Sequence, residues 1–333
     1  MTQEERKMIL QMVADGKISP SEGAELLRAV EQPKAADADG DSAARRVNTF
    51  ASGLSSFIED VVSKVSSAIN ENVGPRYEFP SEVAGEFTAT EVPIHIETVN
   101  GRVEVHTWDH PGYRANIVVK ARGANEEEAR NRARGAFNVQ ADENGFHLES
   151  REGEFSDLGV NVTLMVPKEK TYRLEARSSN GAIEVTDLVA GGGRLETGNG
   201  RLTCRGGKFD RLELRSGNGS MEIESDVRDL AANSGNGSIH VRPTGSDRQN
   251  LRLTTGNGSA HVECSRLPSG TAFAIDAHTG MGSVNLSLPN LEMDRDVRSM
   301  GHKEVKARSQ NFDQAATQVM ITARTGLGSI NID

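Results

Sequence analysis

The run SGNGSMEIESDVRDLAANSGNGSIHV at residues 216–241 contains two copies of the short pattern that decides the fold. Each copy places Ser or Thr three residues before a glycine and continues with alternating apolar and polar residues. Six more copies occur, namely TVNGRVEV (98–105), SSNGAIEV (178–185), TGNGRLTC (197–204), TGNGSAHV (255–262), TGMGSVNL (279–286) and TGLGSINI (325–332). The second glycines of the six copies from residue 178 to residue 286 lie 19, 19, 18, 21 and 24 residues apart, at Gly181, Gly200, Gly219, Gly237, Gly258 and Gly282. A short period of this kind indicates a repeat architecture.

Polarity alternates on both sides of the repeated glycine. The second and fourth residues after it are apolar, as in Ile239 and Val241, and the residue between them is polar. The fifth residue before it is Ala, Leu or Ile. A period of two predicts a β-strand with one buried face on each side of an Asn-Gly corner. Asn and Gly suit such a corner because both tolerate positive φ.

Two architectures fit this pattern. Asn-Gly between alternating strands is a hairpin signal, which would give an antiparallel sandwich, barrel or propeller. Alternatively, each repeat is one coil of a parallel β-helix, in which equal positions stack about 4.8 Å apart. We favour a mainly β fold built as a right-handed parallel β-solenoid of roughly 20-residue coils, because that unit is too short for a propeller blade. Its predicted turn ladder is Asn100, Gly101, Asn180, Gly181, Asn199, Gly200, Asn218, Gly219, Asn236, Gly237, Asn257 and Gly258.

Composition agrees with a repetitive fold and limits the classes of function. Aromatic residues are only 4% of the chain and 34 of its 333 residues are glycine, which suits a narrow core with many turns. The net charge of −10 argues against nucleic-acid binding. The sequence contains neither a secretory-signal pattern nor an apolar run long enough to span a membrane, so we expect a cytoplasmic protein.

Residues 1–31 are predicted to form an α-helical hairpin. Its second helix begins with Ser19-Pro20-Ser21-Glu22, which has the residues of a capping box. Two short helices bury little surface alone, so we expect them to pair with a copy or a partner protein. Residues 32–45 read as a polar linker.

Residues 46–74 are predicted to contain an amphipathic helix. Its apolar stripe provides candidate interaction residues at Phe50, Leu54, Phe57 and Val61. This helix has three interpretations: it caps the solenoid, it mediates oligomerisation, or it lies on a membrane. Few lysines and arginines on its polar face weaken the membrane interpretation.

Residues 75–333 form the predicted solenoid. A helical insert is expected near residues 125–136, with Asn125 as its N-cap. Residues 289–318 form a long polar excursion before the last repeat. Because the chain stops on a repeat strand at Asp333, that strand is expected to leave an open sheet edge unless the excursion covers it.

No recognised catalytic or cofactor-binding motif occurs, so we expect no enzyme activity, no cofactor and no metal site. Cys204 and Cys264 lie on coils three steps apart, roughly 14 Å, and are expected to be buried core thiols. His240 and His261 share an outward position about 5 Å apart, where a pH-sensing or metal-binding role competes with a solvated face. Outward Glu184 and Glu222 are two coils apart and make a poor catalytic pair.

The T/S-x-N-G-x-I-x-V turns, over residues from about 85 to 333, resemble the Toastrack-type "putative adhesin" β-strand repeat domain of bacteria. The segment ERKMILQMVADGKISPSEGAELLRAV resembles the N-terminal module of YvlB-like and LiaX-like proteins, which is related to SHOCT-type oligomerisation modules. The resemblance implies a role beside envelope-stress systems of the Lia and phage-shock type.

The function that we expect is therefore a non-enzymatic scaffold or sensor, which acts through protein partners or self-association of the N-terminal helices. Envelope-stress membrane proteins are candidate partners, and membrane association is a weaker expectation. One alternative is a surface adhesin or ligand-binding module, which would need unconventional export. A carbohydrate-active β-helix enzyme is a remote alternative.

Overall fold

The structure is a computed structural model that describes residues 74–151, 158–245, 247–299 and 302–333. All of them belong to one compact unit. The predicted helical hairpin of residues 1–31, the linker of 32–45 and the helix of 46–74 fall outside the described residues, apart from Gly74. The interaction residues Phe50, Leu54, Phe57 and Val61 are among those left out.

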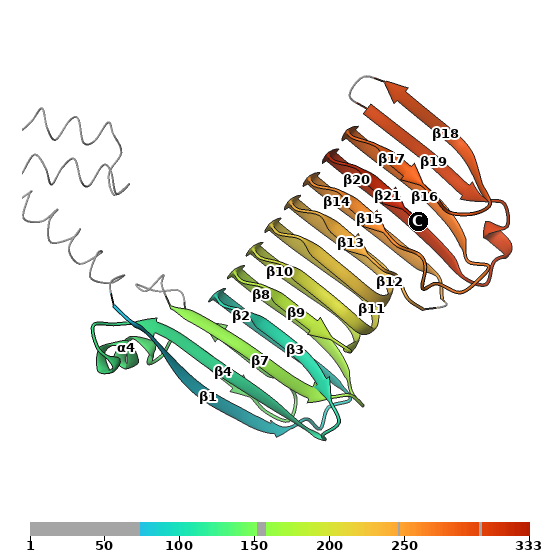
Figure 1. Ribbon diagram of the computed structural model, residues 1–333. Helices are drawn as coiled ribbons and strands as arrows, with labels where there is room; N and C mark the ends of the chain where they lie inside the picture. The colour runs from blue at the N-terminus through green and yellow to red at the C-terminus, as the bar shows by residue number, and fades with distance from the viewer. Residues whose placement is uncertain (1–73, 152–157, 246, 300–301) are drawn as a thin grey trace, which may run out of the picture. The chain divides into compact units, whose positions relative to one another are not determined.

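Each repeat is one coil of a parallel stack, as Figure 1 shows. The strands that lead into the Asn-Gly corner form a first sheet, and the strands that leave the corner form a second sheet. In stack order, the first sheet contains β2 (Glu91–Asn100), β8 (Thr171–Asn180), β10 (Val189–Asn199), the end of β11 (Leu202–Asn218), the end of β12 (Met221–Asn236), β14 (Gln249–Asn257), β20 (Gln318–Leu327) and β16 (Ala272–Met281). The second contains β3 (Val103–Trp108), β9 (Ile183–Thr186), the starts of β11 and β12, β13 (Ile239–Val241), β15 (Ala260–Val262), β21 (Ile330–Ile332) and β17 (Val284–Leu286).

All pairings between these repeat strands are parallel, which confirms stacked coils over antiparallel hairpins. Leu195 pairs with Leu214, and Leu214 pairs with Ala232, so equal repeat positions lie side by side. The hand of the coil stays a prediction.

The stacking order departs from the chain order at the C-terminal end. β20 lies between β14 and β16, and β21 lies between β15 and β17, so the last repeat in the sequence is an internal coil. The expected open edge at the terminal strand is therefore wrong. The outermost coil is formed by residues 279–286 instead, because the excursion carries the chain past that coil and back into the stack.

Both ends of the stack carry added strands. The polar excursion forms a hairpin of β18 (Leu291–Ser299) and β19 (His302–Ser309), which packs antiparallel to β16, and then the short 3-10 helix Phe312–Gln314. At the other end, β5 (Phe137–Ala141) and β6 (Phe146–Ser150) extend the first sheet from β2. β1 (Arg76–Glu86), β4 (Gly112–Arg122) and β7 (Gly159–Pro167) extend the second sheet from β3.

The expected insert is helix α4 (Glu126–Ala133), which packs near β4 and β1. The Asn125 side chain accepts a hydrogen bond from the Glu128 N–H at 2.9 Å, as predicted for an N-cap. Glu128 Oε2 in turn accepts from the Ala124 N–H at 2.9 Å. The helix is therefore held at its start by a reciprocal cap.

The core consists of the apolar positions that the repeat pattern identifies. The second residue after the corner glycine is buried in every coil, as is the fifth residue before it. The fourth residue after it is also buried, except that Leu286 in the outermost coil is only half-buried. Fully enclosed examples include Ile183, Leu195, Leu202, Leu214, Ile239 and Ala260.

Close backbone packing explains the corner glycines better than positive φ does. Only four of the eight second glycines have positive φ, at 145–158°, and no corner asparagine does. The explanation based on positive φ is therefore wrong for the central coils. A Cβ at Gly219 would instead overlap the carbonyl oxygen of Gly200 in the neighbouring coil. The glycine two residues before the corner glycine is equally close-packed. A Cβ at Gly217 would lie 2.7 Å from the carbonyl oxygen of Gly198.

Two hydrogen-bond ladders run along the corner. The buried Ser or Thr of one coil donates to the corner glycine carbonyl of its neighbour, as Thr197 Oγ1 does to Gly181 at 2.9 Å. On the exposed side, each asparagine amide donates to the asparagine beside it, from Asn180 to Asn257, at 2.7–3.0 Å. The predicted asparagine and glycine positions thus form one continuous turn ladder.

We predict that Gly219→Ala destabilises the stack by about 1–3 kcal/mol, because the new methyl group must displace the Gly200 backbone. Gly192→Ala is the matched control, since a Cβ there meets nothing within 4 Å. Thermal and urea unfolding of both variants would measure the difference. Equal midpoints for the two variants would contradict the role of close packing.

We also predict that Thr197→Val lowers the free energy of unfolding by about 1 kcal/mol, because it deprives the half-buried Gly181 carbonyl of a donor. Thr98 is buried at the same repeat position, but its hydroxyl has no hydrogen-bond partner among the described residues. Thr98→Val should therefore leave the unfolding midpoint unchanged or raise it. A greater loss of stability for Thr98→Val than for Thr197→Val would be inconsistent with the hydroxyl ladder.

Candidate functional site: the outward polar faces

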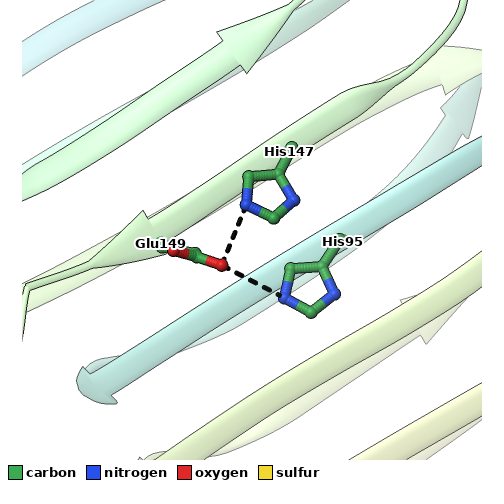
Figure 2. Close-up of side chains that lie close together, drawn as sticks. All are labelled: His95, His147 and Glu149. Atoms are coloured by element: carbon green, nitrogen blue, oxygen red, sulfur yellow. Dashed lines mark ion pairs between the residues drawn. The ribbon is translucent and has the colours of Figure 1, made fainter.

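The first sheet carries a cluster of two histidines and a glutamate on its outward face, which Figure 2 shows. His95 of β2 and His147 of β6 are in register on parallel strands, and their rings stack with centroids 4.7 Å apart. Glu149 Oε1 lies 2.9 Å from His147 Nε2 and 4.0 Å from His95 Nε2. The three ligand atoms lie within 4.8 Å of one another, so these residues have the chemistry and spacing of candidate metal ligands.

The repeat alignment missed this cluster. β6 lies outside the eight glycine-centred copies, so no sequence period connects His147 with His95. The short alternating run FHLES at residues 146–150 is a strand signal, but its pairing partner is decided by the tertiary structure. The prediction of no metal site rested only on known motifs and on the repeat positions, and His147 belongs to neither.

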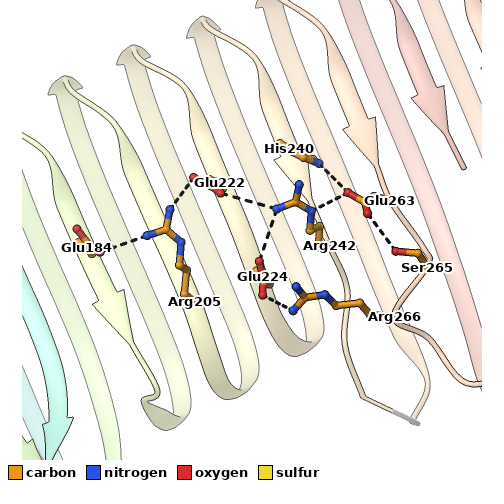
Figure 3. Close-up of polar contacts among 9 residues, drawn as sticks. All are labelled: Glu184, Arg205, Glu222, Glu224, His240, Arg242, Glu263, Ser265 and Arg266. Carbon is orange, nitrogen blue, oxygen red and sulfur yellow. Dashed lines mark hydrogen bonds and ion pairs between the residues drawn. The ribbon is translucent and has the colours of Figure 1, made fainter.

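The second sheet carries a network of alternating charges on its outward face (Figure 3). Arg205 contacts Glu184 at 3.5 Å and Glu222 at 3.0 Å, in the coils on either side. Arg242 contacts Glu263 at 2.6 Å and Glu224 at 3.6 Å. The ion pairs therefore run from coil to coil along the stack.

Glu184 and Glu222 share one guanidinium group in this network. Each carboxylate is an ion-pair partner of Arg205, which stands between them. The geometry gives them a structural role in joining three coils and does not set them as an acid and a base around a substrate.

His240 and His261 stack where the sequence predicts a close pair. Their ring centroids are 4.7 Å apart and their planes differ by 2°. Glu263 lies 3.6 Å from His240, and Asp333 lies 2.7 Å from His261. Burial lowers the pKa of His240, and the charges of Arg242 and His261 lower it further. His240 is therefore disposed to stay neutral.

Both cysteines are free core thiols, as expected. Cys204 is fully buried and Cys264 is nearly so. Burial raises the pKa of each thiol to about 12, which keeps both protonated at neutral pH. They are not candidates for nucleophilic or redox chemistry.

Large apolar side chains are exposed at four described positions, of which two adjoin each other. Leu327 and Met281 occupy the corner positions where other coils have asparagine, and they pair in register between β20 and β16. Leu327 is 51% exposed and Met281 is 64% exposed. On its other side Leu327 pairs with Asn257, so the amide ladder gives way here to an apolar pair. The sequence shows this departure directly, and the structure shows that both side chains face solvent.

The described residues contain no helix with the length and hydropathy needed to cross a membrane.

Comparison with known proteins identifies two matched segments. The family model described as Toastrack DUF4097 matches residues 92–323, and that described as a SHOCT-like domain matches residues 4–35. No curated protein matches at a significant level.

Solved structures of bacterial proteins show a distant likeness. A "putative cell adhesion protein" from Clostridium sporogenes is 12% identical, with 77% of this chain and 99% of that one covered and a TM-score of 0.33. A "putative adhesin" from Bacteroides fragilis is 10% identical, with 77% and 97% covered and a TM-score of 0.39. A "putative lipid binding protein" from Parabacteroides distasonis is 9% identical, with 79% and 98% covered and a TM-score of 0.27. At these identities and TM-scores the likeness says nothing about what this chain binds.

The lowered pKa of His240 predicts a loss of stability in mild acid. The unfolded chain takes up this proton first as the pH falls below about 6.5, so folding becomes less favourable there. We expect His240→Gln to reduce the fall in unfolding midpoint between about pH 7.5 and about pH 5.5. The groups that face His240 are Arg242, Glu222, Glu263 and His261, and all four are retained in this variant.

Replacement of another outward histidine, His106→Gln, serves as the matched control for this measurement. If both variants lose stability in acid as steeply as the wild-type chain, His240 is not the group responsible.

Proposed function

The chain belongs to the Toastrack DUF4097 family, and from this premise we propose that it is a non-enzymatic scaffold and sensor protein of the bacterial cell-envelope stress response. It acts through protein–protein contacts that the rigid stack of coils presents. The SHOCT-like match at residues 4–35 supports a second contact point, through which the chain associates with itself or with a partner.

The apolar pair Leu327 and Met281 is the observation that carries this proposal. In the other six coils the corner position is an asparagine, and in five of them its amide donates to the asparagine of the neighbouring coil. Leucine and methionine give up those hydrogen bonds, yet remain about half exposed or more. Exposed apolar surface in an otherwise polar row is typical of a protein contact site.

The stack holds this pair at a defined position. Parallel pairing on both sides fixes β20 between β14 and β16, and the buried Thr325 hydroxyl donates to Gly258 in the next coil at 2.8 Å. A partner would therefore meet a preorganised surface, which reduces the entropy lost on binding.

Charge rows on the second sheet offer a separate source of specificity. The network of Arg205, Arg242 and their glutamates presents a fixed alternation of charge on the second sheet. Complementary charge on a partner would contribute more to the orientation and register of binding than to its affinity.

The proposal puts the chain in the cytoplasm of unstressed cells and at the membrane, beside envelope-stress membrane proteins, under stress. Cell fractionation and surface protease treatment, before and after a membrane-active peptide, test this part. Movement to the membrane fraction under stress, with protection from external protease, is the expected result. Digestion of the protein on intact cells would instead favour the surface adhesin or ligand-binding function.

We predict that a photo-crosslinking residue at position 327 or 281 joins the chain to one discrete protein in peptide-treated cells. The same residue at Asn199, on the same corner row, should give no such product. Once that protein is identified and purified, Leu327→Asn with Met281→Asn should weaken its binding to the full chain by about tenfold or more.

The double asparagine variant is also expected to fold, since it continues the existing amide ladder and changes no buried residue. Its unfolding midpoint provides the control. Equal crosslinking from positions 199 and 327, or unchanged affinity of the double variant, would rule out the apolar pair as the contact site.

A further inference from the structure

The cluster of His95, His147 and Glu149 carries an inference of its own, independent of the corner surface. We propose that these three side chains bind a Zn²⁺ ion across strands β2 and β6. Imidazole nitrogen and carboxylate oxygen are the ligands that divalent transition-metal ions of this class take in proteins.

The donor spacing suits one small ion. Tetrahedral zinc with bonds of about 2.0–2.1 Å needs donor atoms about 3.3 Å apart. The Glu149 oxygen lies 2.9 Å from one ring nitrogen and 4.0 Å from the other, on either side of that value. Both Nε2 atoms lie on the side of the Glu149 carboxylate (Figure 2), and the two stacked rings must turn out of their parallel arrangement to direct both nitrogen lone pairs at one ion.

One ligand atom is buried and unsatisfied. His95 Nε2 is inaccessible to solvent and has no hydrogen-bond partner among the described residues. A buried polar atom in this condition costs free energy, and a coordinate bond would satisfy it. Glu97 Oε2 lies 3.6 Å from the same nitrogen, within reach as a fourth ligand.

A supporting carboxylate stands behind the first histidine. Glu175 Oε2 of β8 lies 3.5 Å from His95 Nδ1, and Glu175 is itself held by Arg177 at 2.6 Å. Metal-binding histidines commonly donate their second ring N–H to such a carboxylate, which orients the ring. Glu175 is thus a positioning residue, and His95 has partners suited to coordination on both sides.

A surface groove adjoins the two histidines of the cluster. Its lining includes His95 and His147 together with Asp142 and Asn144 from the turn between β5 and β6. Both imidazoles thus border a groove on the protein surface.

The other stacked pair shows why this cluster is selected. His240 and His261 have the same 4.7 Å spacing, but Arg242 bonds to Glu263 beside them, at 2.6 Å. That guanidinium charge repels a cation and occupies the nearby carboxylate. His240 Nε2 is also buried and without a hydrogen-bond partner among the described residues, so this pair is a control that shares the ring spacing and the unsatisfied nitrogen and differs in the arginine.

The test uses the full chain, freed of metal with a chelator and titrated with Zn²⁺ against a fluorescent competitor. We expect one ion per chain. His95→Gln and His147→Gln should each weaken binding by at least about 10-fold, and Glu175→Gln by about 10-fold. The double variant His240→Gln with His261→Gln should bind as the wild-type chain does.

Two further measurements keep the outcome interpretable. Histidine side-chain ¹⁵N shifts should change at His95 and His147 and stay constant at His240 and His261. Unfolding midpoints of the metal-free variants report whether each one folds. Absence of saturable binding, or binding by the His95→Gln/His147→Gln double variant with unchanged affinity, would overturn the proposal.

Discussion

The approach of neighbouring backbones at the Asn-Gly corner is the constraint on which the rest of the structure depends. At Gly200, Gly219 and Gly237 there is no room for a Cβ beside the carbonyl of the adjacent coil. Because these glycines stack directly, equal repeat positions must also stack, and the buried hydroxyls and exposed amides fall into ladders. A side chain at one of these positions would push two coils apart and disturb both sheets.

Stacking in register also arranges the surface. Residues that share an outward position lie side by side on parallel strands. An outward side chain therefore has the side chain at the same position on the next strand as its neighbour, which is of the same type in some rows and of opposite charge in others. Opposite charges make the ion-pair rows around Arg205 and Arg242, while like residues make the two stacked histidine pairs. The same rule brings Leu327 beside Met281. Polar rows, metal-ligand geometry and an apolar contact site thus arise from one packing principle.

Both sites proposed above are binding sites. Glu184 and Glu222, which the sequence makes a poor catalytic pair, share the guanidinium group of Arg205, and both thiols are buried in the core. The proposed functions occupy different places: protein contact at the corner near the C-terminal coils, and zinc on the first sheet near β2. Each can fail without the other, because the two sites have no residue in common.

The repeat pattern alone determined the strands of the eight repeat copies, their buried positions, the asparagine ladder at the corner, and the proximity of His240 to His261. It could do so because a period-two strand within a roughly 20-residue repeat assigns every residue a face and a neighbour. The local sequence also located α4, because the N-cap at Asn125 needs no distant contact. The tertiary structure alone decided where the unrepeated segments go. Insertion of β20 and β21 between earlier coils, and the pairing of β6 with β2 that creates the His95 cluster, join strands far apart in the chain. No local sequence period encodes such pairings, since their stability depends on which sheet edge is free once the other coils have stacked.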